Sequence, residues 1–150
     1  MKKVLLFSLF LVAAGALKAQ VMSPILWSYT AKKTGDKTYE IHLTATIQSS
    51  WHLYSQTQPS DAVVMPTEIK FKKNPLVILD GKVKEVGIMQ AYHDKQLKIS
   101  ANQYAGKVDF VQKIKLKSAV KTSIVGSVQF QTCDDKKCLP PRKLDFSIAL

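Results

Sequence analysis

The chain has 150 residues and a formal net charge of +11, with 46% hydrophobic and 22% charged residues. The positive charge comes from lysines scattered along the chain, with Arg142 as the only arginine, which argues against nucleic acid as a partner. The sequence has no hydrolase constellation, no phosphate-cradling glycine loop and no cofactor motif, which argues against those classes of enzyme.

Residues 1–19 have the layout of a secretory signal peptide. Lys2 and Lys3 form a basic start, an apolar run follows over 4–16, and Ala19 supplies a small residue before a cleavage site. The run is too short to span a bilayer comfortably, and no lipobox cysteine follows it. We therefore expect one soluble exported domain over 20–150, with a formal net charge of +8. The alternative is a retained N-terminal anchor helix.

The first half of this domain contains one clear strand and one aromatic segment. Apolar and polar residues alternate over 39–47, which predicts a half-buried strand with His42 on its solvent face. Residues 51–56 then concentrate aromatic side chains. Trp51 and Tyr54 can simply anchor the core, or Tyr54 can line a site, since its hydroxyl gives a buried ring a polar group.

The middle of the chain reads as short strands separated by turns. Further strands are expected over 68–71, 76–79, 83–88 and 108–116. Asp80–Gly81 and Ala105–Gly106 are expected as turns, and residues 89–103 as a loop with frayed strand ends. No stretch after residue 19 has sustained helical periodicity. This pattern predicts an all-β, antiparallel β-sandwich in a single domain.

The only two cysteines, Cys133 and Cys138, enclose four polar residues near the end of the chain. Alternating segments over 124–130 and 144–150 flank them, which predicts two strands joined by a tight loop that the cysteines close. Outside the cytoplasm two such thiols are normally oxidised unless another protein reduces them.

The cysteine pair can be a structural staple or a redox switch, and spacing and composition leave both open. A disulfide around about six residues contributes roughly 2 kcal/mol in the chain-entropy model, which a domain of this size does not need. A redox pair requires an accessible sulfur that is partly thiolate. Acids follow Cys133 and lysines precede Cys138, so we expect Cys138 to be the nucleophile and Cys133 the resolving cysteine.

Metal delivery through Cys133, Cys138 and a histidine is a further alternative. The three histidines and two cysteines have no finger-like spacing, and a third soft ligand is not evident. We therefore expect no metal and no cofactor.

Three segments resemble the N-terminal domain of the thiol:disulfide interchange protein DsbD. Members of that family have two cysteines around a short polar loop, then an apolar or aromatic residue and Pro-Pro. Residues 51–56 look like the family's aromatic-Leu-Tyr-x-Gln segment, and 92–94 look like its cap-loop region. The resemblance covers about residues 24–150. The cysteine motif is read here as Cys133, Cys138, Leu139, Pro140 and Pro141.

The resemblance implies an immunoglobulin-like sandwich whose cysteine pair carries electrons in the periplasm. A thioredoxin-like domain or a DsbD-type membrane reductase would donate the electrons, and periplasmic disulfide proteins would accept them. A cap loop would shield the sulfurs and move aside on docking. Carried over by position, Cys138 would form the mixed disulfides, Asp94 would be the cap-side acid and Tyr54 a packing or hydrogen-bonding neighbour. The residues expected to cap or line the site are Tyr54, Tyr92, Asp94, Leu97, Leu139 and Pro140.

Two features depart from the family pattern. The cap region reads Asp94-Lys95-Gln96-Leu97 where an aromatic shield is expected, so Tyr92 or Leu97 would cover the sulfurs less tightly. The chain ends at Leu150 without a membrane electron-conducting domain or a C-terminal thioredoxin domain, so we expect a stand-alone module that another protein must reduce. The alternative function is a non-enzymatic secreted β-sandwich that binds a partner and has a purely structural disulfide.

Overall fold

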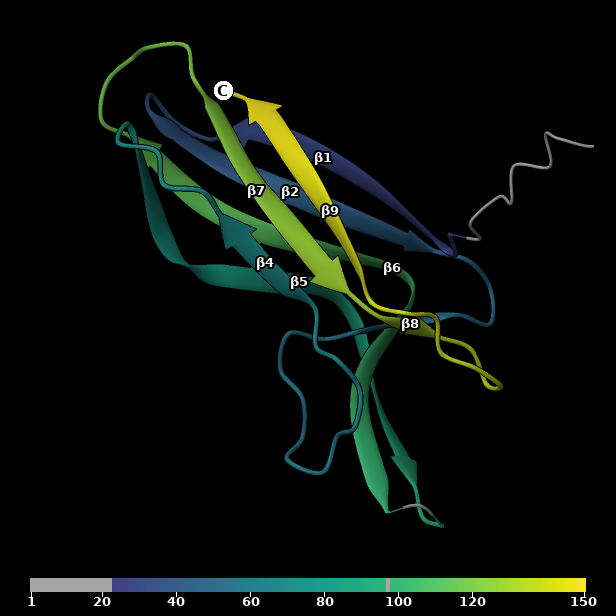
Figure 1. Cartoon of the computed structure of the whole chain (residues 1–150). Coiled ribbons are helices and arrows are strands. Elements are labelled where there is room, and N and C mark those ends of the chain that lie inside the picture. Colours follow the sequence, from purple (N-terminus) through teal and green to yellow (C-terminus); the bar gives the residue numbers. More distant parts are fainter. Residues whose placement is uncertain (1–22, 97) are drawn as a thin grey trace, which may run out of the picture.

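The computed structural model describes residues 23–96 and 98–150. The expected signal peptide, the anchor alternative and Leu97 lie outside these described residues. Within them, nine β-strands and no helix pack as two facing antiparallel sheets (Figure 1). No helix in these two ranges is long and apolar enough to cross a membrane. The prediction of an all-β antiparallel sandwich in a single domain is confirmed.

The larger sheet has six strands. Its order is β1-β2-β6-β3-β8, and β5 pairs with the other edge of β6. The bounds of these strands are β1 Ile25–Lys33, β2 Thr38–Ile47, β3 His52–Tyr54, β5 Val77–Asp94, β6 Ile99–Leu116 and β8 Thr132–Cys133. The smaller sheet has the order β4-β7-β9, with β4 Glu68–Phe71, β7 Ser123–Phe130 and β9 Arg142–Ala149.

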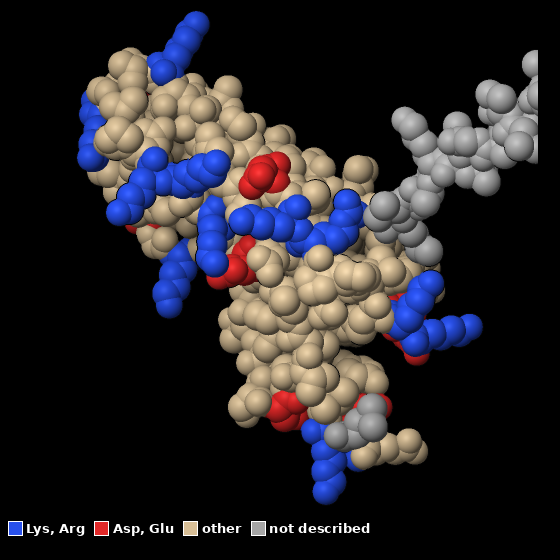
Figure 2. Space-filling view, in the orientation of Figure 1, with Lys and Arg blue, Asp and Glu red and all other residues tan. Residues whose placement is uncertain are grey.

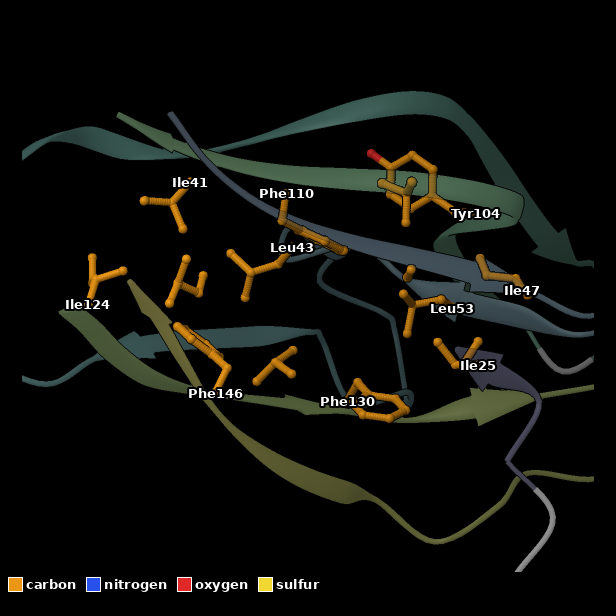
Figure 3. Packing of buried hydrophobic residues seen from close by; sticks show 14 of the residues in the cluster. Ile25, Ile41, Leu43, Ile47, Leu53, Tyr104, Phe110, Ile124, Phe130 and Phe146 are labelled. Carbon is orange, nitrogen blue, oxygen red and sulfur yellow. The ribbon is translucent and has the colours of Figure 1, made fainter. Parts of the chain in front are cut away.

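The core lies between the two sheets and follows from the alternation in the sequence. In β2, Ile41, Leu43 and Ala45 are fully buried, while the residues between them face solvent. Figure 3 shows Ile41 and Leu43 directed toward the smaller sheet, which contributes Ile124, Phe130 and Phe146 to the same core. Apolar burial of this kind drives the sheets together, at about 25 cal/mol per Å² of apolar surface. The strand expected over 39–47 is thus confirmed.

Strands β5 and β6 form one long hairpin, which corrects three predictions. Each strand has 18 residues, so the loop expected over 89–103 and the turns expected at Asp80–Gly81 and Ala105–Gly106 are wrong. Gly81 and Gly106 have φ of 71°, and the register shifts between Asp80 and Lys84 and between Gly87 and Met89. Such β-bulges bend strands without ending them. The end of the hairpin, residues 88–96 and 98–102, extends beyond the sandwich and is named the arm (Figure 1).

The cysteine segment crosses from one sheet to the other. Strand β7 ends at Phe130 in the smaller sheet, and β8 begins at Thr132 in the larger sheet, where it pairs with β3. The chain then returns, and Arg142 pairs with Phe130. The predicted pair of strands around a cysteine-closed loop is confirmed. The additional pairing with β3 places the cysteines against the aromatic segment.

Candidate functional site

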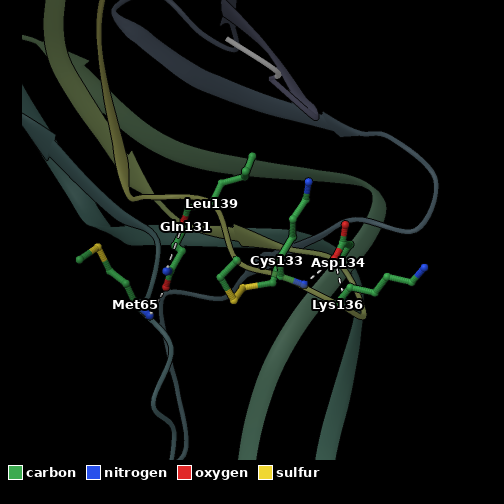
Figure 4. Close-up of a disulfide and its surroundings, with 8 residues drawn as sticks. Met65, Gln131, Cys133, Asp134, Lys136 and Leu139 are labelled. Carbon is green, nitrogen blue, oxygen red and sulfur yellow. Dashed lines mark hydrogen bonds between the residues drawn. A yellow bond between two sulfur atoms is a disulfide. The ribbon is translucent and has the colours of Figure 1, made fainter.

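Cys133 and Cys138 form a disulfide with a Cα–Cα distance of 4.0 Å. The loop between them is a tight turn organised by Asp134 (Figure 4). Its Oδ1 accepts the backbone N–H groups of Lys136 at 2.8 Å and Lys137 at 2.7 Å, and its own N–H donates to the Lys137 carbonyl at 2.9 Å. These two donated N–H groups lower the pKa of the Asp134 carboxyl below its usual value. Hydrogen bonds therefore hold the turn in addition to the disulfide.

The two cysteines differ in exposure. Cys133 is 5% exposed and packs in a small cluster with Tyr54, Ala101 and the partly buried Val64. Cys138 is exposed to solvent. A thiolate from outside can therefore approach the Cys138 side of the bond, whereas the Cys133 side is covered.

The disulfide forms part of the wall of a surface hollow of about 460 Å³. Tyr54 comes to this hollow from β3 and Tyr92 from the arm. Burial, and secondarily the Tyr92 hydroxyl, raise the pKa of Tyr54, so Tyr54 stays a neutral phenol. The full lining is His52, Tyr54, Val63, Val64, Tyr92, Ile99, Ser100, Ala101, Gln103, Cys133, Asp134, Asp135 and Cys138.

The other residues expected at the site lie elsewhere. Asp94 does not line the hollow; its Oδ2 is 3.4 Å from the Tyr92 hydroxyl, and its Oδ1 accepts the Gln96 N–H at 2.8 Å. Leu139 packs against the main core, because the chain must return toward the smaller sheet after Cys138. Pro140 is exposed and does not line the hollow. The structure thus brings together Tyr54, Tyr92, Cys133 and Cys138 from the expected set.

The cover of the hollow includes a segment that sequence reasoning missed. Val63 and Val64 belong to the connection between β3 and β4, residues 55–67, and both line the hollow. Thr67 Oγ1 donates to the Tyr54 carbonyl at 2.5 Å, and the Met65 N–H donates to Gln131 Oε1 at 3.1 Å (Figure 4). These bonds hold the connection against β3 and against Gln131, which lies between β7 and β8. The one feature of the sequence that could have indicated this cover is the pair Val63–Val64, which lies in a mostly polar stretch between two prolines.

Glu85 holds the start of the same connection. Its carboxylate accepts hydrogen bonds from Ser55 Oγ at 2.7 Å, the Gln56 N–H at 2.6 Å and the Tyr104 hydroxyl at 2.6 Å. Ser55 is almost fully buried. Burial and the bond to Glu85 raise the pKa of Tyr104. A carboxylate with three donors is well satisfied, so Glu85 fixes the end of β3, where Tyr54 lies, against the hairpin.

The described residues also bear on the metal alternative. Within 23–96 and 98–150, no group of three or more His, Cys, Asp or Glu side chains is placed to hold a metal ion.

Comparison with known proteins adds family information to this geometry. A family model described as "Thiol:disulfide interchange protein DsbD, N-terminal" matches residues 23–149. The fold is similar to that of the reduced DsbD N-terminal domain of Neisseria meningitidis, with 13% identity, a TM-score of 0.56, and coverage of 89% of this chain and 94% of that chain. That similarity identifies the sandwich as immunoglobulin-like. Comparison with curated proteins found no match.

Two further solved structures have the same fold. The N-terminal periplasmic domain of ScsB from Proteus mirabilis has 19% identity and a TM-score of 0.58. That match covers 91% of this chain and 49% of the other, so this chain spans about half of that ScsB structure. A complex between the DsbD and PilB N-terminal domains of Neisseria meningitidis gives 13% identity, a TM-score of 0.50, and coverage of 85% and 87%.

Proposed function

Because the chain belongs to the family of DsbD N-terminal domains, we propose that it is a periplasmic thiol–disulfide exchange module that relays electrons through Cys133 and Cys138. One observation carries this proposal: the Cys133–Cys138 disulfide lies at a surface hollow, with Cys138 exposed and Cys133 buried. A purely structural staple has no need of a reachable sulfur, whereas an exchange reaction requires one.

In the first half of the relay a donor with two thiols reduces the pair. A donor thiolate attacks Cys138 Sγ, a donor–Cys138 disulfide forms, and the Cys133–Cys138 bond breaks. Cys133 leaves as a thiolate and takes a proton from solvent. The second donor thiol loses its proton and attacks the first donor sulfur, which releases Cys138 as a thiolate. The donor is now a disulfide, and two electrons have moved to this chain.

In the second half the chain reduces a client. The Cys138 thiolate attacks a client disulfide, a mixed disulfide forms, and one client sulfur leaves as a thiolate. Cys133, once deprotonated, attacks Cys138 Sγ, restores the Cys133–Cys138 bond and releases the second client sulfur. Lys136 and Lys137, which precede Cys138 in the exposed turn, favour its thiolate form.

The surroundings of the sulfurs limit which partners can react. Tyr92 on the arm and Val63 and Val64 on the 55–67 connection narrow the approach to the disulfide. In this proposal Tyr54 packs on the buried sulfur, and the tip of the arm around Asp94 moves aside when a partner docks. Leu139 and Pro140 set the direction in which the chain leaves the cysteine turn.

The donor proposed here is a thioredoxin-like domain or a DsbD-type membrane reductase, and the acceptors are periplasmic disulfide proteins. Support comes from the related DsbD N-terminal domain, which has been solved in complex with the PilB N-terminal domain. A domain that docks face to face on the sulfur-bearing surface is the kind of partner that the hollow accommodates.

Trapping of the mixed disulfide tests the proposal. Cys133→Ala leaves Cys138 as the sole cysteine, and we expect it to form a covalent complex with a thioredoxin-like protein that has lost its resolving cysteine. The matched Cys138→Ala variant should trap far less. Trapping by Cys138→Ala alone, or by neither variant, would overturn the assigned roles.

A further inference from the structure

We propose that the free edge of β5 is the site where a second copy of this chain pairs, antiparallel and about a two-fold axis at Met89, to form a continuous sheet across a dimer. This inference does not depend on the exchange chemistry. Among the described residues β5 pairs only with β6. The backbone groups along its other edge therefore form no strand pairing, although natural sheets normally protect so long an edge.

The exposed edge carries an unusual run of apolar side chains. Ile88 is 84% exposed, Val86 58% and Tyr92 47%. Met89 is exposed as well, and no lysine, arginine or proline interrupts residues 85–93. Those residue types are the usual protection against edge-to-edge pairing. Figure 2 shows charged side chains over the sandwich and at the lower tip, with fewer of them on the surface between. Neighbouring exposed apolar side chains such as Val86, Ile88 and Tyr92 mark an interaction site.

The register with β6 shows which side chains share a face. Lys84 and Val86 line a hollow on the outer face of the larger sheet together with His42 and Asp109. Tyr92 pairs with Ala101 and lines the disulfide hollow, which lies on the same outer face farther along β6. Residues 84, 86, 88, 90, 92 and 94 therefore point the same way, as alternation in a strand requires.

Charge selects a second copy as the occupant. In an antiparallel pairing about Met89, Lys84 of one copy lies opposite Asp94 of the other, and Val86 lies opposite Tyr92. Symmetry repeats both contacts, since a two-fold interface uses the same patch on each copy. Directly opposite residues of unlike charge, and aromatic residues opposite β-branched ones, stabilise a strand pair. The edge is thus complementary to itself in charge and in the positions of its apolar side chains.

Sedimentation equilibrium of the exported protein tests this pairing. We expect a dimer whose fraction rises with concentration. Lys84→Asp places two like-charged pairs in the interface and should weaken the dimer about tenfold, whereas the double variant Lys84→Asp with Asp94→Lys should restore it. Ile88→Lys should give a monomer. Val120→Lys changes an equally apolar, exposed residue away from the edge and should leave the dimer intact. Circular dichroism confirms that each variant is folded.

Three results would overturn the inference. The wild-type protein could remain monomeric at every concentration at which it is soluble. The dimer could persist unchanged in Ile88→Lys, or the double variant could fail to restore what Lys84→Asp removes. If the wild type is a monomer and Ile88→Lys impairs only the reaction with a thioredoxin-like protein, the edge is a binding site for that partner and not for a second copy. Activity of the disulfide is measured separately, so loss of the dimer and loss of exchange are distinguishable.

Discussion

Cys133 pairs directly with His52 across the β3–β8 ladder. Cys133 is therefore part of the larger sheet, while Cys138 belongs to the turn that leaves it. The disulfide joins a position fixed by backbone pairing to a position on the surface. Reduction can leave the buried sulfur in place and free the exposed one, which is the division of roles that a resolving and an attacking cysteine need.

This division predicts unequal reactivity in the reduced protein. The thiol of Cys138 in the Cys133→Ala variant should be alkylated several times faster than the thiol of Cys133 in the Cys138→Ala variant, because Cys133 is buried under Tyr54 and Val64. Rates of iodoacetamide labelling at neutral pH measure the difference. Faster labelling of Cys133 would contradict the assignment.

The turn at Asp134 predicts a specific pH dependence. Its folded-state pKa is depressed from 3.8 because the carboxylate accepts two backbone N–H groups, so the ionised form favours the folded state. That contribution is present above the unfolded pKa and is lost as the pH falls through the lower folded pKa. Asp134→Ala should lower the urea midpoint at pH 7 slightly and near pH 2 hardly at all. Asp135→Ala is the matched control, because among the described residues the Asp135 carboxylate accepts no hydrogen bond within the turn. Equal effects of the two variants would contradict the account.

Glu85 predicts a link between stability and coverage of the disulfide. Glu85→Ala leaves Ser55, the Gln56 N–H and Tyr104 without their acceptor, which should cost about 2–3 kcal/mol of unfolding free energy. The 55–67 connection should also loosen, so dithiothreitol should reduce the disulfide faster. Glu68→Ala removes an exposed carboxylate that forms an ion pair with Lys70 and should change stability by less than about 0.5 kcal/mol. If Glu85→Ala and Glu68→Ala lowered the unfolding free energy by similar amounts, Glu85 would not be the residue that holds the 55–67 connection in place.

The position of Val64 beside Cys133 predicts that this side chain slows reduction of the disulfide. Val64→Ala removes two methyl groups from the cluster around Cys133 and should cost about 1 kcal/mol, while increasing the rate of reduction by dithiothreitol. Val120→Ala, at an exposed valine that does not line the disulfide hollow, should change neither quantity. Stopped-flow reduction and urea unfolding measure the two effects, and an unchanged rate in Val64→Ala would show that this side chain does not shield the disulfide.

The sandwich could be predicted from sequence wherever one face of a strand is buried. In β2 and in the β7–β9 hairpin, burial on one side imposes the alternation that the sequence shows. The arm could not be predicted, because it leaves the sandwich and β5 is exposed over most of this length. Without one-sided burial the period-two signal disappears, and bulges at Gly81 and Gly106 then resemble turns.

The site could be predicted only where its residues lie in local sequence motifs. Cys133, Cys138 and Tyr54 stand in short motifs whose chemistry is visible locally. Glu85 and Ala101 could not be found, since their places depend on contacts between strands distant in the sequence: Ser55 and Glu85 are 30 residues apart. Leu139 was expected at the site from its position beside Cys138, but the return of the chain to β9 directs it to the core.

The reduction potential of the Cys133–Cys138 pair tests the central proposal most directly. The protein is equilibrated in graded thiol buffers, and the fraction of disulfide is followed by thiol labelling. We predict a potential between roughly −120 and −270 mV, the range of exchange proteins, with reduction of the folded protein by a thioredoxin-like donor. A potential below about −300 mV, with a bond that reacts only after unfolding, would contradict the proposal and identify the disulfide as a structural staple.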